Sequence, residues 1–179
     1  FVFLLLRFEE LGLTLAQRLS GAETKARADR MVAKTLRLLP DGYHVFHDLV
    51  LGGVHIAHAV VGPNGFFPVI NRTNLGRITD VRDSLRLNGL PFLRDIVSLA
   101  WRRSHALLRQ LDLGHSGDLQ VCPVLCFSRA SVDAGRLIRG VMITQTSSLV
   151  RLILEHESVL SSEKILKLTD RLAPMVRVK

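Results

Sequence analysis

Four histidines and an aspartate lie close together in the sequence, and these residue types can bind a metal or transfer a proton. They are His44, His47, Asp48, His55 and His58. Imidazole and carboxylate groups together suit metals softer than Mg²⁺. Side chains of an extended segment alternate between its two faces, so His55 and His58 are expected to point to opposite sides, and the same holds for His44 and His47. The spacing therefore favours surface or hydrogen-bonded histidines over one shared metal site.

Cys122 and Cys126 are the only cysteines, and they lie four positions apart in an apolar segment. On a strand, this spacing places both side chains on the same face. A structural zinc site needs a second pair of ligands, and Pro123 between the two cysteines does not fit the helix start of a redox CxxC motif. We therefore expect free thiols in a hydrophobic core, and a reducing, cytoplasmic setting.

The chain is basic, with 24 Lys and Arg against 16 Asp and Glu and a formal net charge of +8. Such a balance favours polyanions such as nucleic acid or an acidic membrane surface. The basic residues are spread along the chain without a run of five or more, so a merely soluble basic surface is an equally good interpretation. Trp101, Arg102 and Arg103 have the composition of a base-stacking patch, although a lone Trp at helical spacing more often belongs to the core.

Common catalytic and nucleotide-binding motifs are missing from the sequence. It contains no Gly-x-Ser-x-Gly elbow, no phosphate-binding GxxxxGK[ST] loop and no dinucleotide-binding GxGxxG motif. A Ser/His/Asp hydrolase and the common nucleotide-binding folds therefore find no support.

The first residues, 1–8, form the apolar stretch FVFLLLRF. It is too short to cross a bilayer, which needs about 20 apolar residues, and it lacks the charged region and cleavage site of a signal peptide. Two interpretations remain: a helix that packs on the domain, or the end of a longer span lost upstream. Because 179 residues fit one domain, we divide the chain into an N-terminal helical segment, 1–21, and a main domain, 22–179. In the second interpretation, segment 1–21 is the end of a truncated upstream element.

Two helices are expected before residue 40. The first covers 4–19 and is interrupted by Ser20-Gly21. The second covers 22–39, because apolar residues recur there at spacings of three and four while basic residues take the other positions. Its expected core stripe is Met31, Val32, Thr35, Leu36 and Leu39.

Three strand-like segments follow, over 43–51, 54–61 and 66–72. The turns between them are too short for crossovers, so the three strands should form an antiparallel meander. Residues 75–78 extend it, and the polar stretch 80–88 indicates a loop.

The second half of the chain alternates between helical and strand-like patterns. A long helix is expected over 90–113, with Pro91 in its first turn and Leu93 in its core stripe. Further elements are a buried strand over 119–127, a loop around 128–135, a strand over 140–144, and helices over 147–155 and 161–172, the last with Ser162 as its N-cap. The strand after the long helix should lie parallel to its predecessor. This order predicts an α/β sandwich whose central mixed sheet combines the meander with one or two later strands and is flanked by helices.

Several segments in the first half resemble one family. Residues 28–29 are Ala-Asp, residues 39–49 are LPDGYHVFHDL, residues 56–74 are IAHAVVGPNGFFPVINRTN and residues 76–78 are GRI. They resemble the signature part of nuclease-related domains, which has a helix beginning Gly-Glu, a "pdgy.v..dl" turn and strand, an "iDhvvvgpnGvfvIE.K" strand pair and a following "n..G.i". The frame holds without gaps from Ile56 to Ile78, and fainter likeness extends over most of 28–173.

This resemblance implies a restriction-endonuclease-like fold. In such nucleases an acid on one strand, with an acid and a lysine on the next, gathers Mg²⁺ and water beside a scissile phosphate. Here the aspartate position is Ala57, the glutamate position is Asn71 and the lysine position is Thr73. Asp29 alone keeps the helix-borne acid, as a replacement for glutamate. One carboxylate does not normally hold a catalytic Mg²⁺, so the resemblance implies a degenerate motif without catalytic or metal-binding residues.

We therefore expect a catalytically inactive nuclease-like domain, a cytoplasmic pseudoenzyme without a cofactor. Its role would be that of a nucleic-acid-binding or scaffolding module, with nucleic acid or other protein subunits as partners. The basic residues expected to contact phosphates are Lys34, Arg37, Arg72 and Arg77.

Two alternatives remain open. One is an active Mg²⁺-dependent nuclease with displaced ligands drawn from Asp29, Asp48, Asp80 and Asp83. The other is a membrane-tethered protein-interaction domain, whose membrane contact would come from a missing N-terminal segment.

Overall fold

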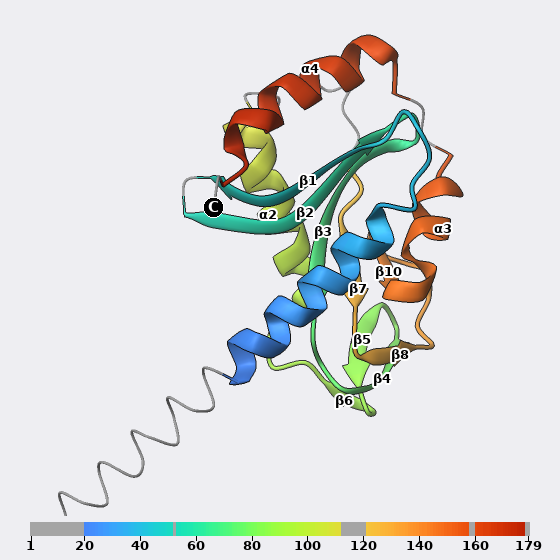
Figure 1. Ribbon diagram of the computed structural model, residues 1–179. Helices are drawn as coiled ribbons and strands as arrows, with labels where there is room; N and C mark the ends of the chain where they lie inside the picture. Colours follow the sequence, from blue (N-terminus) through green and yellow to red (C-terminus); the bar gives the residue numbers. More distant parts are fainter. Residues whose placement is uncertain (1–19, 52, 112–120, 158–159, 178–179) are drawn as a thin grey trace, which may run out of the picture.

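The computed structural model describes residues 20–51, 53–111, 121–157 and 160–177, and in them the chain builds a six-stranded sheet and a smaller four-stranded one (Figure 1). The larger sheet has the order β1 (His44–Leu51), β2 (Val54–Gly62), β3 (Gly65–Arg72), β7 (Val124–Phe127), β10 (Val141–Gln145) and β9 (Leu137–Ile138). Strands β1, β2 and β3 form the predicted antiparallel meander. Strand β7 lies parallel to β3, β10 lies parallel to β7, and β9 is antiparallel to β10. The predicted mixed sheet is therefore confirmed.

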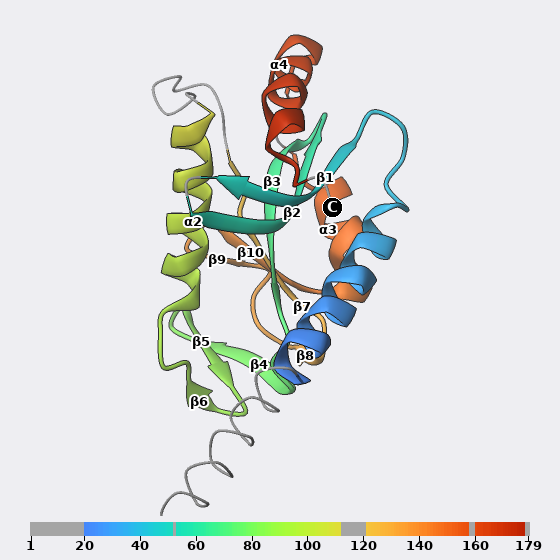
Figure 2. The ribbon, with the colours of Figure 1, turned by 60° about the vertical axis from the view of Figure 1, so that its left-hand side comes forward.

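Helices cover both faces of the larger sheet, as Figures 1 and 2 show. The first helix, helical over 20–36, and α3 (Leu149–Leu154) lie on one face. The 3-10 turn η1 (Thr146–Ser148) connects β10 to α3. Helices α2 (Ile96–Gln110) and α4 (Ser162–Leu172) lie on the other, and η2 (Ala173–Met175) follows α4. Because Phe66 packs toward α2 and α4 while Phe67 packs toward the first helix and α3, alternation along β3 serves both layers. None of the helices in the described ranges is long and apolar enough to cross a membrane.

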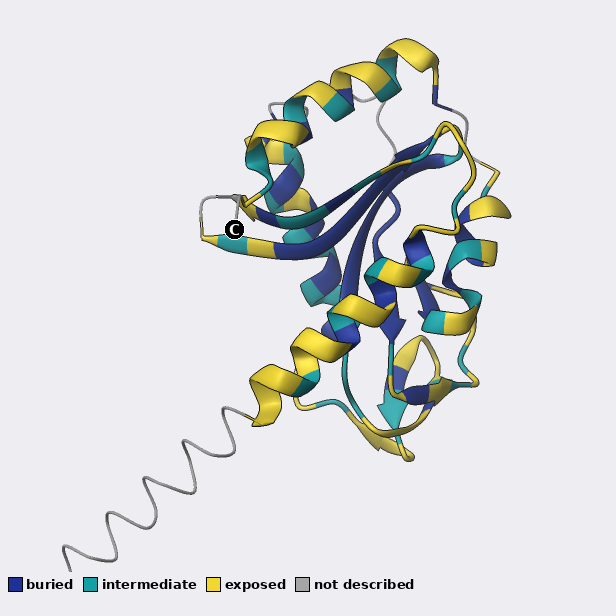
Figure 3. Cartoon of the chain, viewed as in Figure 1, coloured by how far each residue is buried: buried dark blue, intermediate teal, exposed yellow. Residues whose placement is uncertain are grey.

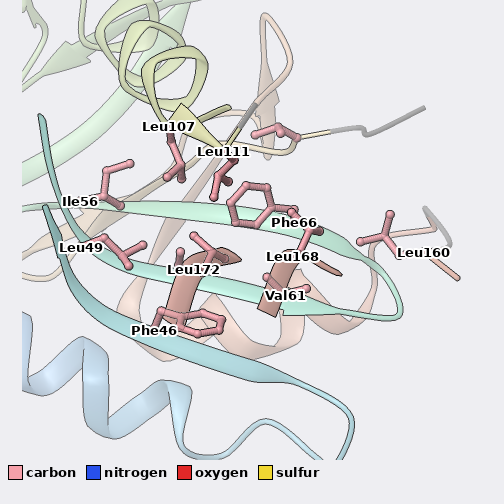
Figure 4. Close-up of a cluster of buried hydrophobic side chains, with 12 residues drawn as sticks. Phe46, Leu49, Ile56, Val61, Phe66, Leu107, Leu111, Leu160, Leu168 and Leu172 are labelled. Atoms are coloured by element: carbon pink, nitrogen blue, oxygen red, sulfur yellow. The ribbon is translucent and has the colours of Figure 1, made fainter. Parts of the chain in front are cut away.

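The core lies between the strands and these helices. In Figure 4, Phe66 of β3, Leu107 of α2 and Leu172 of α4 point toward one another, and all three are fully buried. Figure 3 shows that the inner strands are buried along most of their length while the helices expose their outer faces. Burial of this kind is the main favourable contribution to folding, so the sheet is the rigid frame of the molecule.

The smaller sheet corrects two predictions, the loop over 80–88 and the extension of the meander by residues 75–78. It has the order β6 (Leu90–Pro91), β5 (Ser84–Leu87), β4 (Gly76–Val81) and β8 (Ala130–Val132). Two tight hairpin turns, Arg82-Asp83 and Asn88-Gly89, join its strands, and all four turn residues have positive φ. Positive φ at both central residues is the geometry that joins antiparallel strands most tightly. The Asn-Gly pair was therefore a hairpin signal, and strand β8 likewise replaces part of the loop predicted at 128–135.

The long helix begins later than predicted. Asp95 is its N-cap, and its Oδ1 accepts hydrogen bonds from the backbone N–H groups of Val97 and Ser98 at 3.1 Å. A capping carboxylate satisfies donors that otherwise lack partners, and this fixes the start of α2 at Ile96. The expectation for the preceding residues was wrong: Pro91 lies in β6, and Leu93 is 105% exposed.

Three smaller expectations at the ends of elements are also corrected. Ser20 and Gly21 are both helical, so the interruption predicted at these two residues is wrong, and the helix ends at Leu36. The expected stripe is reduced too, because Val32 and Leu36 are fully buried whereas Met31 is 53% exposed. The helix predicted over 4–19, the end of the one over 90–113 and residues 119–120 lie outside the described residues.

Serine 161, and not Ser162, caps α4, because its hydroxyl accepts a hydrogen bond from Lys164 N. Strand β7 begins only at Val124, since Pro123 cannot donate to a ladder.

The two cysteines are free and buried in the same core cluster, as predicted. Burial raises the pKa of Cys122 to about 11 and that of Cys126 to about 12. The Sγ atom of Cys122 lies 2.8 Å from Nε2 of His156. Both thiols are therefore protonated at neutral pH and act as small core side chains.

Candidate functional site

Strands β2 and β3 separate at one end, and a cavity occupies the fork between them. Their backbone pairing runs from Gly62–Gly65 to His58–Val69 and goes no further, although both strands continue. The cavity has a volume of about 310 Å³. Its lining comes from the two separated strands, the first helix and α2: Gly53, Val54, His55, Ile56, Ala57, Ile70, Asn71, Lys25 and Arg103. We refer to it as the fork cavity.

Asp29 on the first helix lies beside this cavity, and each of its carboxylate oxygens has a partner. Its Oδ1 accepts a hydrogen bond of 2.9 Å from Nδ2 of Asn71, and its Oδ2 lies 2.7 Å from Nζ of Lys25. Lys25 is one helical turn before Asp29, a spacing at which opposite charges meet. Asn71 reaches Asp29 because odd-numbered side chains of β3 point to the face that the first helix covers. The carboxylate is thus compensated by a cation and an amide.

The predicted degenerate positions are only partly brought together. Asp29 and Asn71 are in contact, and Ala57 lines the fork cavity with Asn71. Thr73 comes just after the end of β3 and does not line this cavity. The Oδ1 atom of Asn71 is buried and has no hydrogen-bond partner among the described residues. Since Nδ2 already donates to a carboxylate, this carbonyl oxygen is oriented away from Asp29.

The histidines form two separate contacts. Nδ1 of His58 lies 2.8 Å from Nδ1 of His47, and Nε2 of His55 lies 3.4 Å from Oδ1 of Asp48. His58 is 3% exposed, and burial, with a smaller contribution from His47, lowers its pKa to about 4. One ring must donate and the other accept in the His47–His58 contact, so the pair cannot be doubly protonated.

The basic residues predicted to contact phosphates lie on different elements. Lys34 is exposed on the first helix, and Arg37 is exposed just after it. Arg77 on β4 forms an ion pair with Asp133. Arg72 at the end of β3 differs, because its Nε is buried without a partner in the part of the chain that the structure describes. Burial lowers the pKa of Arg72, and the nearby cation of Arg103 lowers it further.

The carboxylates proposed as displaced metal ligands also lie on different elements. Asp48 is on β1, Asp80 on β4 accepts a hydrogen bond of 2.8 Å from Gly135 N, and Asp83 is in the turn between β4 and β5. Within residues 20–51, 53–111, 121–157 and 160–177, no three His, Cys, Asp or Glu side chains are grouped so as to hold a metal ion.

The family model described as nuclease-related domain matches residues 24–128, more than half of the 179-residue chain. The chain belongs to the nuclease-related domain family. The matched range runs from the first helix to just after β7, so it contains the fork cavity and both residues that contact Asp29. The mixed α/β architecture of this nuclease-related domain is the restriction-endonuclease-like sandwich expected from the sequence. Comparison with curated proteins and comparison with solved structures found no match.

The structure explains the most family-like segment of the domain, the turn between β2 and β3. Asn64 in this turn donates from Nδ2 to the carbonyl oxygens of Leu154 at 2.9 Å and His156 at 2.6 Å, and its Oδ1 accepts from the Tyr43 hydroxyl. The last carbonyls of a helix lack intrahelical partners, so Asn64 satisfies one such acceptor, on Leu154 at the end of α3, and also the carbonyl of His156 just beyond the helix. The turn therefore anchors the helix to the sheet.

Lys25 and Arg103 were not assigned to one site from the sequence, although both line the fork cavity. Lys25 had a usable signal, since a lysine four positions before an aspartate on a helix predicts an ion pair. Arg103 was noted only for a base-stacking composition with Trp101 and Arg102. Its place at this cavity had no signal, because α2 is far from β3 in the sequence and only the packing of the sandwich brings them together.

Proposed function

We propose that this nuclease-related domain binds nucleic acid without cleaving it. The observation that carries the proposal is the state of Asp29. In the family pattern a helix-borne acid works beside two strand-borne acids, whereas here Asp29 is held by Lys25 Nζ at 2.7 Å and Asn71 Nδ2 at 2.9 Å. The Lys25 ammonium thus neutralises Asp29 as a metal ion would, and the Asn71 amide stands where the family has an acid that binds the metal.

The residues at the family positions do not fit a hard divalent cation. Mg²⁺ requires near-octahedral oxygen coordination, usually with more than one carboxylate or with phosphates. No carboxylate is among the described residues that line the fork cavity, Ala57 offers no ligand, and Asn71 offers one neutral oxygen. Lys25 beside Asp29 adds a positive charge that repels a metal. The residues at this site therefore do not support a metal-assisted step.

The same substitutions favour the binding of phosphate. Loss of strand-borne acids removes charges that would repel a polyanion, and Lys25 and Arg103 remain in the lining of the fork cavity. The net charge of +8 adds long-range attraction. Lysine and arginine contacts to phosphates give affinity that falls steeply as salt concentration rises. The expected activity is thus salt-dependent retention of nucleic acid.

Gel-shift titrations with DNA and RNA oligonucleotides between about 50 and 200 mM salt test this proposal. We expect shifted complexes that weaken with salt, and intact oligonucleotides after incubation with Mg²⁺ or Mn²⁺. Absence of any salt-dependent complex would leave a scaffolding role toward proteins instead. Metal-dependent cleavage that an Asp29→Asn variant loses would establish the active nuclease with displaced ligands.

A further inference from the structure

A second, larger cavity shares Arg103 with the fork cavity. Its volume is about 760 Å³, and it lies between the end of β3, strands β5 and β6, and the N-terminal half of α2. Figure 2 shows β5 and β6 beyond the N-terminal end of α2. Volumes of roughly 300–1,000 Å³ are typical of small-molecule sites, so this space can hold one nucleotide.

The lining of this larger cavity combines two chemistries. Its apolar side chains are Leu87, Leu90, Pro91, Phe92, Leu93, Ile96 and Leu99. Three arginines also line it, Arg72, Arg94 and Arg103, and no carboxylate is among the described residues of the lining. Leu90 is 71% exposed and Leu93 is 105% exposed, although both are large apolar side chains. An apolar rim beside uncompensated cations fits a ligand with a flat apolar part and an anionic part.

Arg72 and Arg103 form the cationic side of this arrangement. Arg72 is half-buried, its Nε lacks a partner in the described part of the chain, and Arg103 is close enough to help lower its pKa. By contrast, Arg139 pairs with Asp95 at 2.6 Å and Arg136 pairs with Glu155 at 2.9 Å. Two neighbouring guanidinium groups repel each other, and an anion between them offsets this repulsion, because guanidinium–phosphate pairs are strong and geometrically matched.

We propose that this larger cavity binds one nucleotide of a single-stranded nucleic acid, with the phosphate on Arg72 and Arg103 and the base against the apolar wall. This inference rests on the proposed function and specifies its ligand. Stacking of a base on an aromatic or guanidinium surface contributes without sequence preference. The bases of a duplex are already stacked and paired, so they cannot enter the cavity without being unpaired. The domain should therefore prefer single strands to duplexes of equal length.

Fluorescence anisotropy with a labelled oligothymidylate, and with a duplex of the same length, tests the inference. An Arg103→Gln variant should bind the single strand about tenfold more weakly, which is typical for one lost charge-assisted contact, and its log–log salt slope should fall by about 0.7. Arg102→Gln is the matched control, because Arg102 is the neighbouring, exposed arginine of the same helix and lines neither cavity. It should change affinity less than twofold. Leu93→Ser should weaken single-strand binding about threefold and leave duplex binding unchanged.

The outcomes separate this inference from the proposed function. Equal effects of Arg103→Gln and Arg102→Gln, or equal affinity for single strand and duplex, would overturn the nucleotide site even if salt-dependent binding persists. If no oligonucleotide binds, the proposed function fails, and calorimetric titration with deoxythymidine 5′-monophosphate decides the cavity's role: binding that Arg103→Gln weakens would support a mononucleotide site, and no binding would overturn it. Equal melting temperatures of the two arginine variants exclude unfolding as the cause.

Discussion

Replacement of Asn71 by glutamate tests the contact between residue 71 and Asp29, because it restores an acid at the family's glutamate position. The hydrogen bond from Asn71 Nδ2 to Asp29 Oδ1, at 2.9 Å, is lost, and a second carboxylate is placed at contact distance from Asp29. Loss of a hydrogen bond to a charged group costs about 1.5–3 kcal/mol, and two carboxylates in contact cannot both stay ionised without a cation. Lys25 offsets part of the repulsion.

We therefore expect Asn71→Glu to lower the free energy of unfolding by about 3 kcal/mol at pH 7, or the melting temperature by about 6–12 °C for a chain of this size. The control is Asn71→Gln, because glutamine has the size of glutamate, carries no charge and keeps an amide donor. Urea denaturation of both variants, followed by circular dichroism, isolates the charge effect. The difference should shrink as pH falls and the new glutamate takes up a proton. It should also shrink in an Asp29→Asn background, as a double-mutant cycle measures. Equal stability of the glutamate and glutamine variants at pH 7 would refute the reasoning. It would mean either that residue 71 does not contact Asp29 or that a cation neutralises the added carboxylate.

Three further predictions follow from the structure. Asn64→Ala should lower the free energy of unfolding by about 2–3 kcal/mol, since the carbonyls of Leu154 and His156 and the Tyr43 hydroxyl lose their partner. Asn74→Ala, as the control in urea denaturation, should cost under about 0.5 kcal/mol. Folding lowers the pKa of His58 from 6.5 to about 4. As pH falls, the unfolded chain is therefore protonated at this histidine at a higher pH than the folded chain, and about 3 kcal/mol of stability should be lost between pH 6.5 and pH 4. A His58→Leu variant should show a shallower loss in the same pH series, and an unchanged slope would assign the loss to other groups. Cys122 and Cys126 should resist iodoacetamide at pH 8 until the domain is unfolded, as intact mass spectrometry can show, because burial raises both thiol pKa values to about 11 and 12.

Local patterns were enough to predict the central sheet. Apolar runs separated by short turns specify hairpins, so β1, β2 and β3 and their antiparallel pairing followed from 43–72 alone. The parallel pairing of β7 with β3 followed from the helix between them. The smaller sheet was missed because its strands are short and polar residues interrupt their apolar ones, so the composition resembles a loop until Arg82-Asp83 and Asn88-Gly89 are recognised as turns with positive φ.

The candidate site was harder to predict, because it depends on where two strands separate and on which distant segments pack there, and local sequence patterns specify neither. The family pattern placed Asp29, Ala57 and Asn71 at one site, and the structure indeed holds Asp29 and Asn71 in contact. Strict alternation could not describe β2 near the fork, where Ile56 and Ala59, three positions apart, pack in the same core cluster. Nothing in the sequence indicated that β2 and β3 would separate after His58 and Val69, or that Arg103 would line the cavity between them.

The most direct test of the central claim measures cleavage and binding in one experiment. The wild-type domain is incubated with labelled single-stranded and duplex oligonucleotides in Mg²⁺ or Mn²⁺, with EDTA and an Asp29→Asn variant as controls, and both complexes and products are quantified. We expect complexes that weaken as salt rises and the same uncleaved oligonucleotide length in every lane. Products that form only with metal, and that disappear with EDTA and in Asp29→Asn, would contradict it.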